Sequence, residues 1–302
     1  MRVTQGMLNN QLLRNVNTNL TRMQGNQEQL TTGRRINRPS DDPVGMAFSL
    51  RYRSEQSATD QYKSNLDSAI SALDYTDSMM GQANTVIQRV RELAVSGANG
   101  TNPQQALDSI RSEVDQLYTQ MVSIGNSQFN GKYIFNGQMT DKAPYTEATA
   151  STDKVDSGEH LLNIGVGVQI ASNQTGHAVF GPADDPANPG TKDNIFRVMK
   201  DLSAALGAGD TNEVSVLIAR LDKSNDQFLE ARADVGAKMN RMELAQSRLE
   251  DVGVNLKTLQ TKTEDADVSE VITNLKMDEN VYQSSLSVGA KIISATLVDF
   301  IR

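Results

Sequence analysis

Apolar side chains recur with helical spacing along most of this chain, and the stripes reach both of its ends. The first stripe predicts a helix over residues 5–32, which Gly33 ends because a residue without Cβ readily takes the left-handed conformation there. Asp42 followed by Pro43 is typical of a capping residue and the first residue of a helix. After an interruption, Asp267 has the same capping position before a last apolar stripe, so both ends are predicted to be helical.

Two long segments carry heptad seams, in which apolar positions alternate at steps of three and four. One seam extends from Tyr62 to Ala94, and the other from Val214 to Thr263. Such seams pack against partner helices. Further apolar residues widen the face of the first seam, and the stripe over 106–124 supplies a local antiparallel partner. The predicted fold is therefore mainly α, built as a long antiparallel helical rod.

The helical period stops at about residue 129, where the pattern of turns and strands takes over. Asn130-Gly131 and Asn136-Gly137 fit the positive φ angles of tight hairpin turns. Residues 140–192 are rich in Gly, Pro, Ser, Thr and Asp, and apolar residues alternate at 166–170. We predict a small all-β insertion at 140–192 that lies at the periphery, so that its removal leaves the helices folded.

Composition and charge remove several classes of function. The 302 residues carry a net charge of −8, which repels nucleic acid and anionic membrane surfaces. No stretch has the ~18 uninterrupted apolar residues of a membrane span, and the first residues lack the apolar core of a cleavable signal peptide. The chain has no Cys, so disulfides and thiolate chemistry are excluded. These signals alone indicate a cytosolic protein that binds neither nucleic acid nor membranes.

No catalytic, cofactor-binding or metal-binding residues can be assigned from motifs. His160 and His177 are the only histidines, and they lack the spacing of a metal site. The glycines of residues 165–169 are too few for a dinucleotide fingerprint and predict a strand instead. Helix capping explains Asp42 better than paired catalytic carboxylates do. We therefore predict a protein that is not an enzyme and takes no cofactor.

The two terminal stripes carry opposite charge. Residues 1–40 contain six Arg and one acidic residue, whereas residues 264–302 contain seven acidic residues and three basic ones. The two ends could fold back on the body or become ordered only against neighbouring subunits, and stripes without an internal partner favour the second alternative. The apolar side chains predicted to form an assembly interface are Leu8, Leu12, Leu20, Met23, Leu275, Tyr282, Leu286, Ile293 and Leu297.

Several strings resemble a known superfamily. LTTGRRINRPSDDPVGMAFSLRYRS (30–54), the stretch 65–101 and SQFNG (127–131) resemble the N-terminal region of bacterial flagellins, and TEDADVSEVITNLKMDENVYQSSLSVGAKII (263–293) resembles their C-terminal region. GKYIFNGQMTDKAPY (131–145) is more similar to the branch of the superfamily that forms the junction between hook and filament. A filament flagellin stays the alternative.

The resemblance implies a domain organisation and a place of action. Residues 1–42 and 265–302 would form an inner assembly domain that is disordered in the monomer, 43–139 and 193–264 a helical rod domain, and 140–192 a small exposed β domain. The resemblance further implies a ring of copies in the flagellum that contacts the adjacent hook-associated protein and flagellin. Type III export without a cleaved signal would place the chain outside the cell, which replaces the cytosolic expectation, and an export chaperone would hold the C-terminal region.

One further feature and two further classes follow from the same residues. Gln88, Arg89 and Leu93 are similar to the flagellin patch that an innate immune receptor of vertebrate hosts binds, although an ordinary helix with a solvated Arg face and a core Leu explains them better. A secreted helical effector with chemistry in 140–192 would need convergent polar groups, and that segment shows no triad-like order. A coiled-coil signalling module would need a membrane anchor or a catalytic output, and the sequence offers neither.

Overall fold

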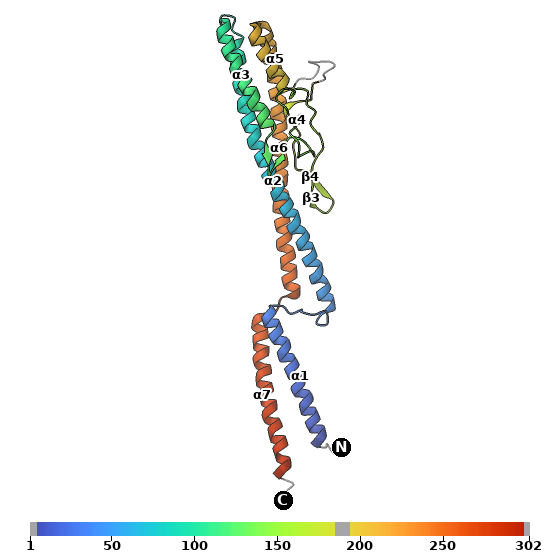
Figure 1. The fold of residues 1–302 in the computed structure, drawn as a ribbon. Helices are drawn as coiled ribbons and strands as arrows, with labels where there is room; N and C mark the ends of the chain where they lie inside the picture. Colours follow the sequence, from blue (N-terminus) through green and yellow to red (C-terminus); the bar gives the residue numbers. More distant parts are fainter. Residues whose placement is uncertain (1–4, 185–193, 299–302) are drawn as a thin grey trace. The chain divides into compact units, whose positions relative to one another are not determined.

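The computed structural model describes residues 5–184 and 194–298, and the chain divides into two compact units. The first unit comprises residues 1–58 and 251–302, and the second comprises residues 59–250. The fold is mainly α, with long helices paired antiparallel, as the seams predict (Figure 1). The long helices are α1 (Gln5–Thr32), α2 (Pro43–Gly97), α3 (Gln104–Gly125), α5 (Ile195–Ala208), α6 (Thr211–Glu264) and α7 (Val268–Val298).

The helix ends lie where the local sequence predicts them. Gly33 has a φ of 71°, and its N–H donates to the carbonyl of Gln29 at 2.8 Å. The Asp42 carboxylate accepts from the N–H of Gly45 at 2.9 Å, which caps α2. The Asp267 carboxylate caps α7 in the same way, accepting from Glu270 N at 3.2 Å. These local signals therefore determine where α1 ends and where α2 and α7 begin.

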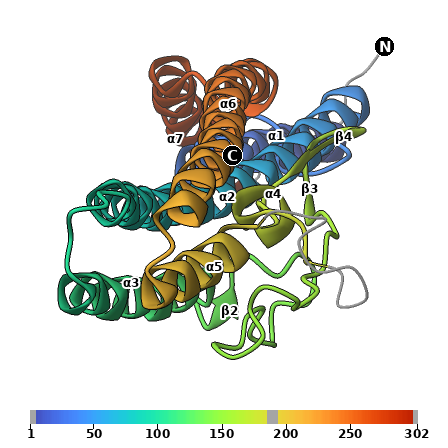
Figure 2. The ribbon, with the colours of Figure 1, turned by 90° about the horizontal axis from the view of Figure 1, so that it is seen from above.

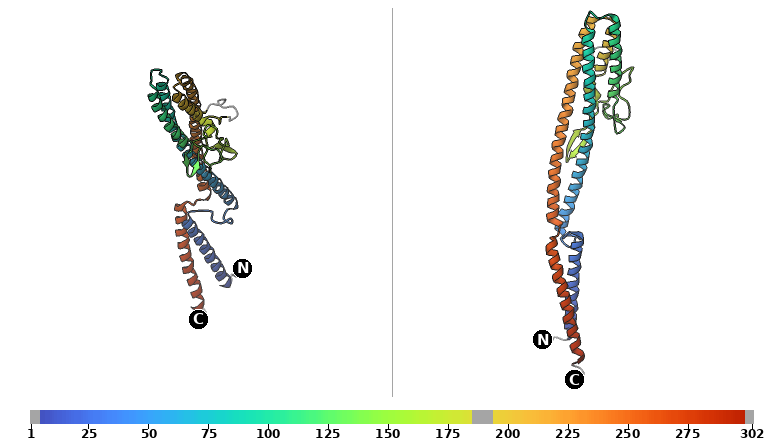
Figure 3. Two further views of the ribbon diagram at one scale, coloured as in Figure 1. Left: turned by 45° about the horizontal axis from the view of Figure 1, so that its top comes forward. Right: turned by 90° about the vertical axis from the view of Figure 1, so that its left-hand side faces the viewer.

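In the second unit, α2 and α6 run antiparallel over many turns, as the right-hand view of Figure 3 shows. Three polar contacts mark the register. Arg91 Nε lies 2.6 Å from Asp222, Arg232 Nε lies 2.7 Å from Asp77, and Gln246 Nε2 donates to Asp67 at 2.7 Å. The residue number falls on α2 as it rises on α6, which is the mark of an antiparallel pair.

The hydrophobic core lies in the second unit. The α2 seam is confirmed, because each of its positions from Leu66 to Ala94 is at most 4% exposed. The first part of the α6 seam is buried as well, with Val214 and Phe228 each 1% exposed. Helices α3 and α5 pack beside each other, and the end-on view of Figure 2 shows them next to α2 and α6. The wide apolar face of α2 is thus covered by more than one helix, as predicted.

Within the described residues, the β structure of the middle segment consists of two hairpins. Strands β1 (Gln128–Phe129) and β2 (Lys132–Tyr133) are joined by Asn130 and Gly131, whose φ angles are 51° and 75°, as the Asn-Gly pattern predicts. Strands β3 (Leu161–Gly165) and β4 (Val168–Ala171) form the second hairpin.

Within residues 165–169, the prediction of one continuous strand is wrong. Val166 is 93% exposed and lies with Gly167 in the turn between β3 and β4. Gly167 has a φ of 72°, a conformation that suits glycine and turns the chain back on itself.

The middle segment is not peripheral, because its aromatic residues are part of the core. The centre of the Tyr145 ring lies 4.7 Å from the centre of the Phe196 ring on α5. The ring of Phe180, at the end of α4 (Gly176–Phe180), has its centre 5.3 Å from that of Phe196. Phe135 contacts Phe180 at 5.1 Å. Burial raises the pKa of the Tyr145 hydroxyl. Removing this segment would therefore uncover α5, contrary to the sequence prediction.

Phe196→Ala is expected to lower the free energy of unfolding by about 3–5 kcal/mol, because it leaves a cavity at the centre of this aromatic cluster. Urea unfolding followed by circular dichroism measures the loss. Leu229→Ala is the control: this α6 side chain is 44% exposed, so the change is expected to cost less than about 1 kcal/mol. Equal losses in the two variants would contradict the assignment of the cluster to the core.

Candidate assembly surface

The first unit has few buried apolar side chains and many exposed ones. Among its described residues, the apolar side chains that are buried are Ile36, Leu256 and Val271. Its exposed large apolar side chains are Met7, Leu8, Leu13, Val44, Phe48, Leu50, Val252, Val254, Leu259, Val268, Ile272, Met277, Val281, Leu286 and Val288. A unit that leaves so much apolar surface in water is suited to pack against other subunits.

Helices α1 and α7 pair with each other in this unit, side by side in Figure 1. The two helices approach closely at the buried Gly289, where a Cβ would lie 2.7 Å from Leu12 Cδ2. Nearer the other end of the pair, the carboxylate of Asp278, whose side chain is 9% exposed, accepts from Asn26 Nδ2 at 2.9 Å and lies 3.3 Å from Arg22 Nη2. The basic and acidic ends of the chain therefore meet, as their charges predict.

The residues predicted for the assembly interface take different positions. Leu12, Leu20, Met23, Leu275 and Tyr282 are half-buried on α1 and α7. Two other residues of the predicted interface are more open to solvent: Leu8 is 44% and Leu286 is 48% exposed. The side chains of Ile293 and Leu297 lie outside the described residues. The role of all nine in assembly stays a prediction.

The end of α6 adds exposed apolar residues that the sequence prediction assigned to an internal seam. Val252 is 38% and Leu259 is 44% exposed, so these seam positions are not covered, although α2 continues beside the end of α6. The sequence contains a sign of this exposure, because α2 carries no heptad seam before Tyr62, whereas the seam of α6 continues to Thr263. With residue 246 opposite residue 67, the last turns of α6 face the part of α2 that lacks the pattern.

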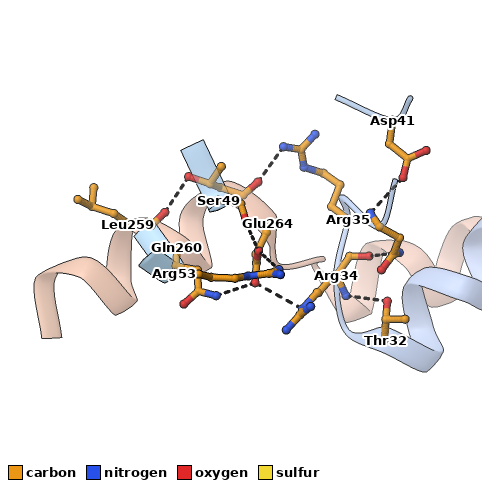
Figure 4. A network of polar contacts seen from close by, with 11 residues as sticks. Thr32, Arg34, Arg35, Asp41, Ser49, Arg53, Leu259, Gln260 and Glu264 are labelled. Atoms are coloured by element: carbon orange, nitrogen blue, oxygen red, sulfur yellow. Dashed lines mark hydrogen bonds and ion pairs between the residues drawn. The ribbon is translucent and has the colours of Figure 1, made fainter. Parts of the chain in front are cut away.

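Glu264, the last residue of α6, is a buried carboxylate at the base of the α1–α7 pair. Its side chain is 2% exposed, and Figure 4 shows the donors around it. Ser49 Oγ donates to it, Arg53 Nη2 lies 2.5 Å away, Gln260 Nε2 donates at 2.9 Å, and Arg34 Nε lies 3.4 Å away. The carboxylate thus joins α2, α6 and the connection that follows α1.

Backbone hydrogen bonds join the connection after α1 to the connection after α6, close to Glu264. Arg35 N donates to the Glu264 carbonyl at 2.7 Å, and Ala266 N donates to the Gly33 carbonyl at 3.0 Å. The two chain segments that lead to the terminal helices therefore cross as a short antiparallel pair, next to the carboxylate.

The Glu264 carboxyl has a lowered pKa. Burial raises this pKa, but the hydrogen bonds from Ser49, Arg53 and Gln260 together with the Arg53 charge outweigh burial. A lowered pKa in the folded state means that the group stabilises the fold above its unfolded pKa of about 4.3. That stabilisation is lost as the pH falls through the folded pKa.

Glu264→Gln is expected to lower the free energy of unfolding at pH 7 by about 1.5–3 kcal/mol, because the charged hydrogen bonds are removed. Below about pH 4 the difference from the parent should shrink, since the parent carboxylate becomes protonated. Unfolding curves at a series of pH values measure the difference. Glu243→Gln, at an exposed position on α6, is the control, and a gap that does not change with pH would exclude this role for Glu264.

The residues that match the immune-receptor patch lie on α2. Gln88 and Arg89 are exposed, whereas Leu93 is 7% exposed and belongs to the core. Arg89 is paired with Glu113 at 2.7 Å and with Glu92 at 3.0 Å. The hydrogen bonds that Arg89 donates to Glu113 and Glu92 raise its pKa. The local structure is thus that of an ordinary helix, with a solvated arginine and a core leucine.

The helical regions at the two ends of the chain match known protein families. The bacterial flagellin N-terminal helical region matches residues 3–140, and the bacterial flagellin C-terminal helical region matches residues 218–301. Together the matches cover more than half of the chain. The chain belongs to the flagellin family. It is accordingly a structural protein of that family and not an enzyme. Among the described residues, no helix of this flagellin-family chain is both long and apolar enough to span a membrane.

Relatives of this flagellin-family chain include proteins from two parts of the flagellum. Flagellar hook-associated protein 3 of Salmonella typhimurium is 26% identical over 94% of this chain and 95% of the relative. Flagellin of Bacillus subtilis is 26% identical over 94% of each chain, and the flagellar filament 33 kDa core protein of Treponema phagedenis is 28% identical over 93% of this chain and 91% of its own.

Solved structures share the fold. A flagellar hook-associated protein of Vibrio parahaemolyticus has a TM-score of 0.67 at 21% identity and covers 74% of this chain and 100% of its own. The flagellar junction protein FlgL of Legionella pneumophila has a TM-score of 0.59 at 14% identity, covering 72% of this chain and 100% of its own.

Proposed function

We propose that this flagellin-family chain is the junction subunit that connects the hook, through its associated protein, to the flagellin filament. The observation that carries the proposal is the similarity to flagellar hook-associated protein 3, which extends over 94% of this chain and 95% of that relative. The stretch 131–145, which resembles the junction branch of the superfamily, supports it.

The terminal helices are the proposed means of assembly. Residues 1–42 and 265–302 form the inner assembly domain, and their exposed apolar side chains, such as Leu8 and Leu286, contact neighbouring subunits. Those neighbours are further copies of this chain in a ring, the adjacent hook-associated protein and flagellin. Residues 43–139 and 193–264 form the rod domain, and 140–192 form a small exposed β domain whose Tyr145 and Phe180 rings pack against α5 of the rod. A chaperone holds the C-terminal region before export to the outside of the cell.

A filament flagellin is the second candidate. The similarity to Bacillus subtilis flagellin, 26% identical over 94% of each chain, favours it. A filament subunit would use the same terminal helices, so the two candidates differ in position along the flagellum and in copy number, not in the kind of contact.

Immunogold electron microscopy of isolated flagella distinguishes the two. A junction subunit is expected in a single short zone between hook and filament, whereas a filament subunit would be labelled along the whole length. Deletion of the gene gives an independent result: hooks without filaments, with flagellin shed into the medium, agree with the junction. Label along the whole filament would overturn the proposal.

A further inference from the structure

A cavity of about 380 Å³ lies in the second unit, between α2 and the two hairpins. This volume is at the small end of ligand pockets, which measure about 300–1,000 Å³. Helix α2 supplies small side chains, Ser68, Ala69 and Ala72, which leave space next to the helix. Phe129 and Leu162, one from each hairpin, add apolar surface.

The walls of this cavity are held in place by contacts within the protein. The Phe129 ring packs against Tyr75 of α2, with the ring centres 5.4 Å apart. Asn65 Nδ2 donates to the carbonyl of Asn163 at 2.9 Å and ties the β3–β4 hairpin to α2. The Asn173 side chain accepts from His160 N at 2.9 Å. The cavity is therefore formed before any ligand arrives, which lowers the cost of binding.

Several polar groups lining the cavity have no partner in the part of the chain that the structure describes. The Lys132 ammonium and the Tyr133 hydroxyl make no hydrogen bond or ion pair there. His160 Nδ1 lies 3.3 Å from Ser172 Oγ, which leaves its Nε2 free. The lining contains Lys132 and His160 but no Asp or Glu, although the whole chain has 37 acidic residues against 29 Lys and Arg. The lining thus offers a lysine to an anion, and the neighbouring Asp156 carboxylate accepts hydrogen bonds from Gln138 N at 2.7 Å and Gly158 N at 3.3 Å.

We propose that this cavity binds a small acidic saccharide of the uronic acid type. Phe129 and Leu162 offer apolar surface to one face of a sugar ring, and amide and hydroxyl groups of the lining, such as Asn130 and Thr140, suit its hydroxyls. Lys132 pairs with the carboxylate through a charge-assisted hydrogen bond. The proposal does not depend on whether the chain is a junction subunit or a filament subunit.

The two histidines allow a direct test on the full chain. NMR of histidine-labelled protein gives ring signals for His160, which lines the cavity, and for His177, which is exposed on α4 and serves as an internal control. Methyl β-glucuronide is expected to shift the His160 signals saturably, with a Kd of about 1 mM or below, and to leave those of His177 unchanged. Methyl β-glucoside, which lacks only the carboxylate, is expected to bind about tenfold more weakly.

Variants locate the carboxylate partner. Lys132→Met is expected to weaken glucuronide binding about tenfold, whereas Lys154→Met, at an exposed position that does not line the cavity, should leave it unchanged. Tyr133→Phe removes only a hydroxyl and gives a second variant if Lys132→Met does not fold. Absence of saturation at about ten times the expected Kd, equal binding of glucoside and glucuronide, or binding of benzoate in place of the glucuronide would each overturn the proposal.

Discussion

Cells that carry the double variant Leu286→Asp and Ile272→Asp are expected to show hooks without filaments, while the purified variant unfolds like the parent. Leu286 is 48% and Ile272 is 46% exposed, so charging them removes little packing from the isolated chain. In an assembled interface each apolar side chain would contribute about 1.5–3 kcal/mol on burial, and a buried unpaired carboxylate would add a further penalty. Two such changes are enough to abolish a contact between subunits.

Electron microscopy of cells, together with circular dichroism of the purified chain, measures both halves of this expectation. Leu161→Asp is the matched control, because Leu161 is 51% exposed but lies on β3, outside the first unit. The double variant must also be measured in the growth medium. If it is exported and filaments still form, α7 is not the assembly surface; if it stays inside the cell, the substitutions disrupt binding to the export chaperone instead.

Hydrogen exchange on the monomer is expected to show two levels of protection that differ by at least about a thousandfold. Amides of α2 between Leu66 and Ala94, which lie on the buried seam, should open only with global unfolding. Amides of α1 and α7 should exchange far faster, because the first unit buries few apolar side chains to oppose opening. Mass spectrometry of peptides after timed deuteration reads both levels in one experiment.

Protection of α1 and α7 equal to that of α2 would contradict this view of the first unit. It would also contradict the prediction that residues 1–42 and 265–302 become ordered only in the assembly. In assembled flagella the same peptides should exchange slowly, since neighbours then cover the exposed apolar side chains.

Much of the fold could be predicted from the sequence, because its helix ends depend on a few neighbouring residues. Gly33, the Asp42-Pro43 pair and Asp267 each act through a local hydrogen bond or a local backbone preference. The Asn130-Gly131 turn is local in the same sense. Heptad steps predicted the buried face of α2 because the period of a helix decides which residues share a face.

Features that depend on contacts between distant residues could not be predicted in this way. Tyr145 and Phe180 lie in a Gly-rich segment without a regular period, and only the folded chain places them against Phe196. Glu264 looks like one acid among several in TEDAD, yet its carboxylate is enclosed by Ser49 and Arg53, more than 200 positions earlier in the chain.

The candidate surface was predictable in part. The stripes on α1 and α7 named Leu8 and Leu286, which are indeed exposed, but they also named half-buried residues such as Leu12. The periodicity alone gives a face of a helix and does not say which part of that face the other terminal helix covers. The register between α1 and α7 decides this, and it depends on contacts such as Leu12 with Gly289 and Asn26 with Asp278.

The pairing of α1 with α7 joins the first helix of the chain to the last, and this has a consequence for quality control. A ribosome that stops between residues 265 and 267 releases a polypeptide in which α2, α3, α5 and α6 are complete and the core can close, but α1 has no helix to pair with. Such a fragment lacks half of the proposed docking face. The growing flagellum could thereby reject truncated chains without any separate proofreading factor, because only a polypeptide that supplies both helices completes the surface that its neighbours recognise.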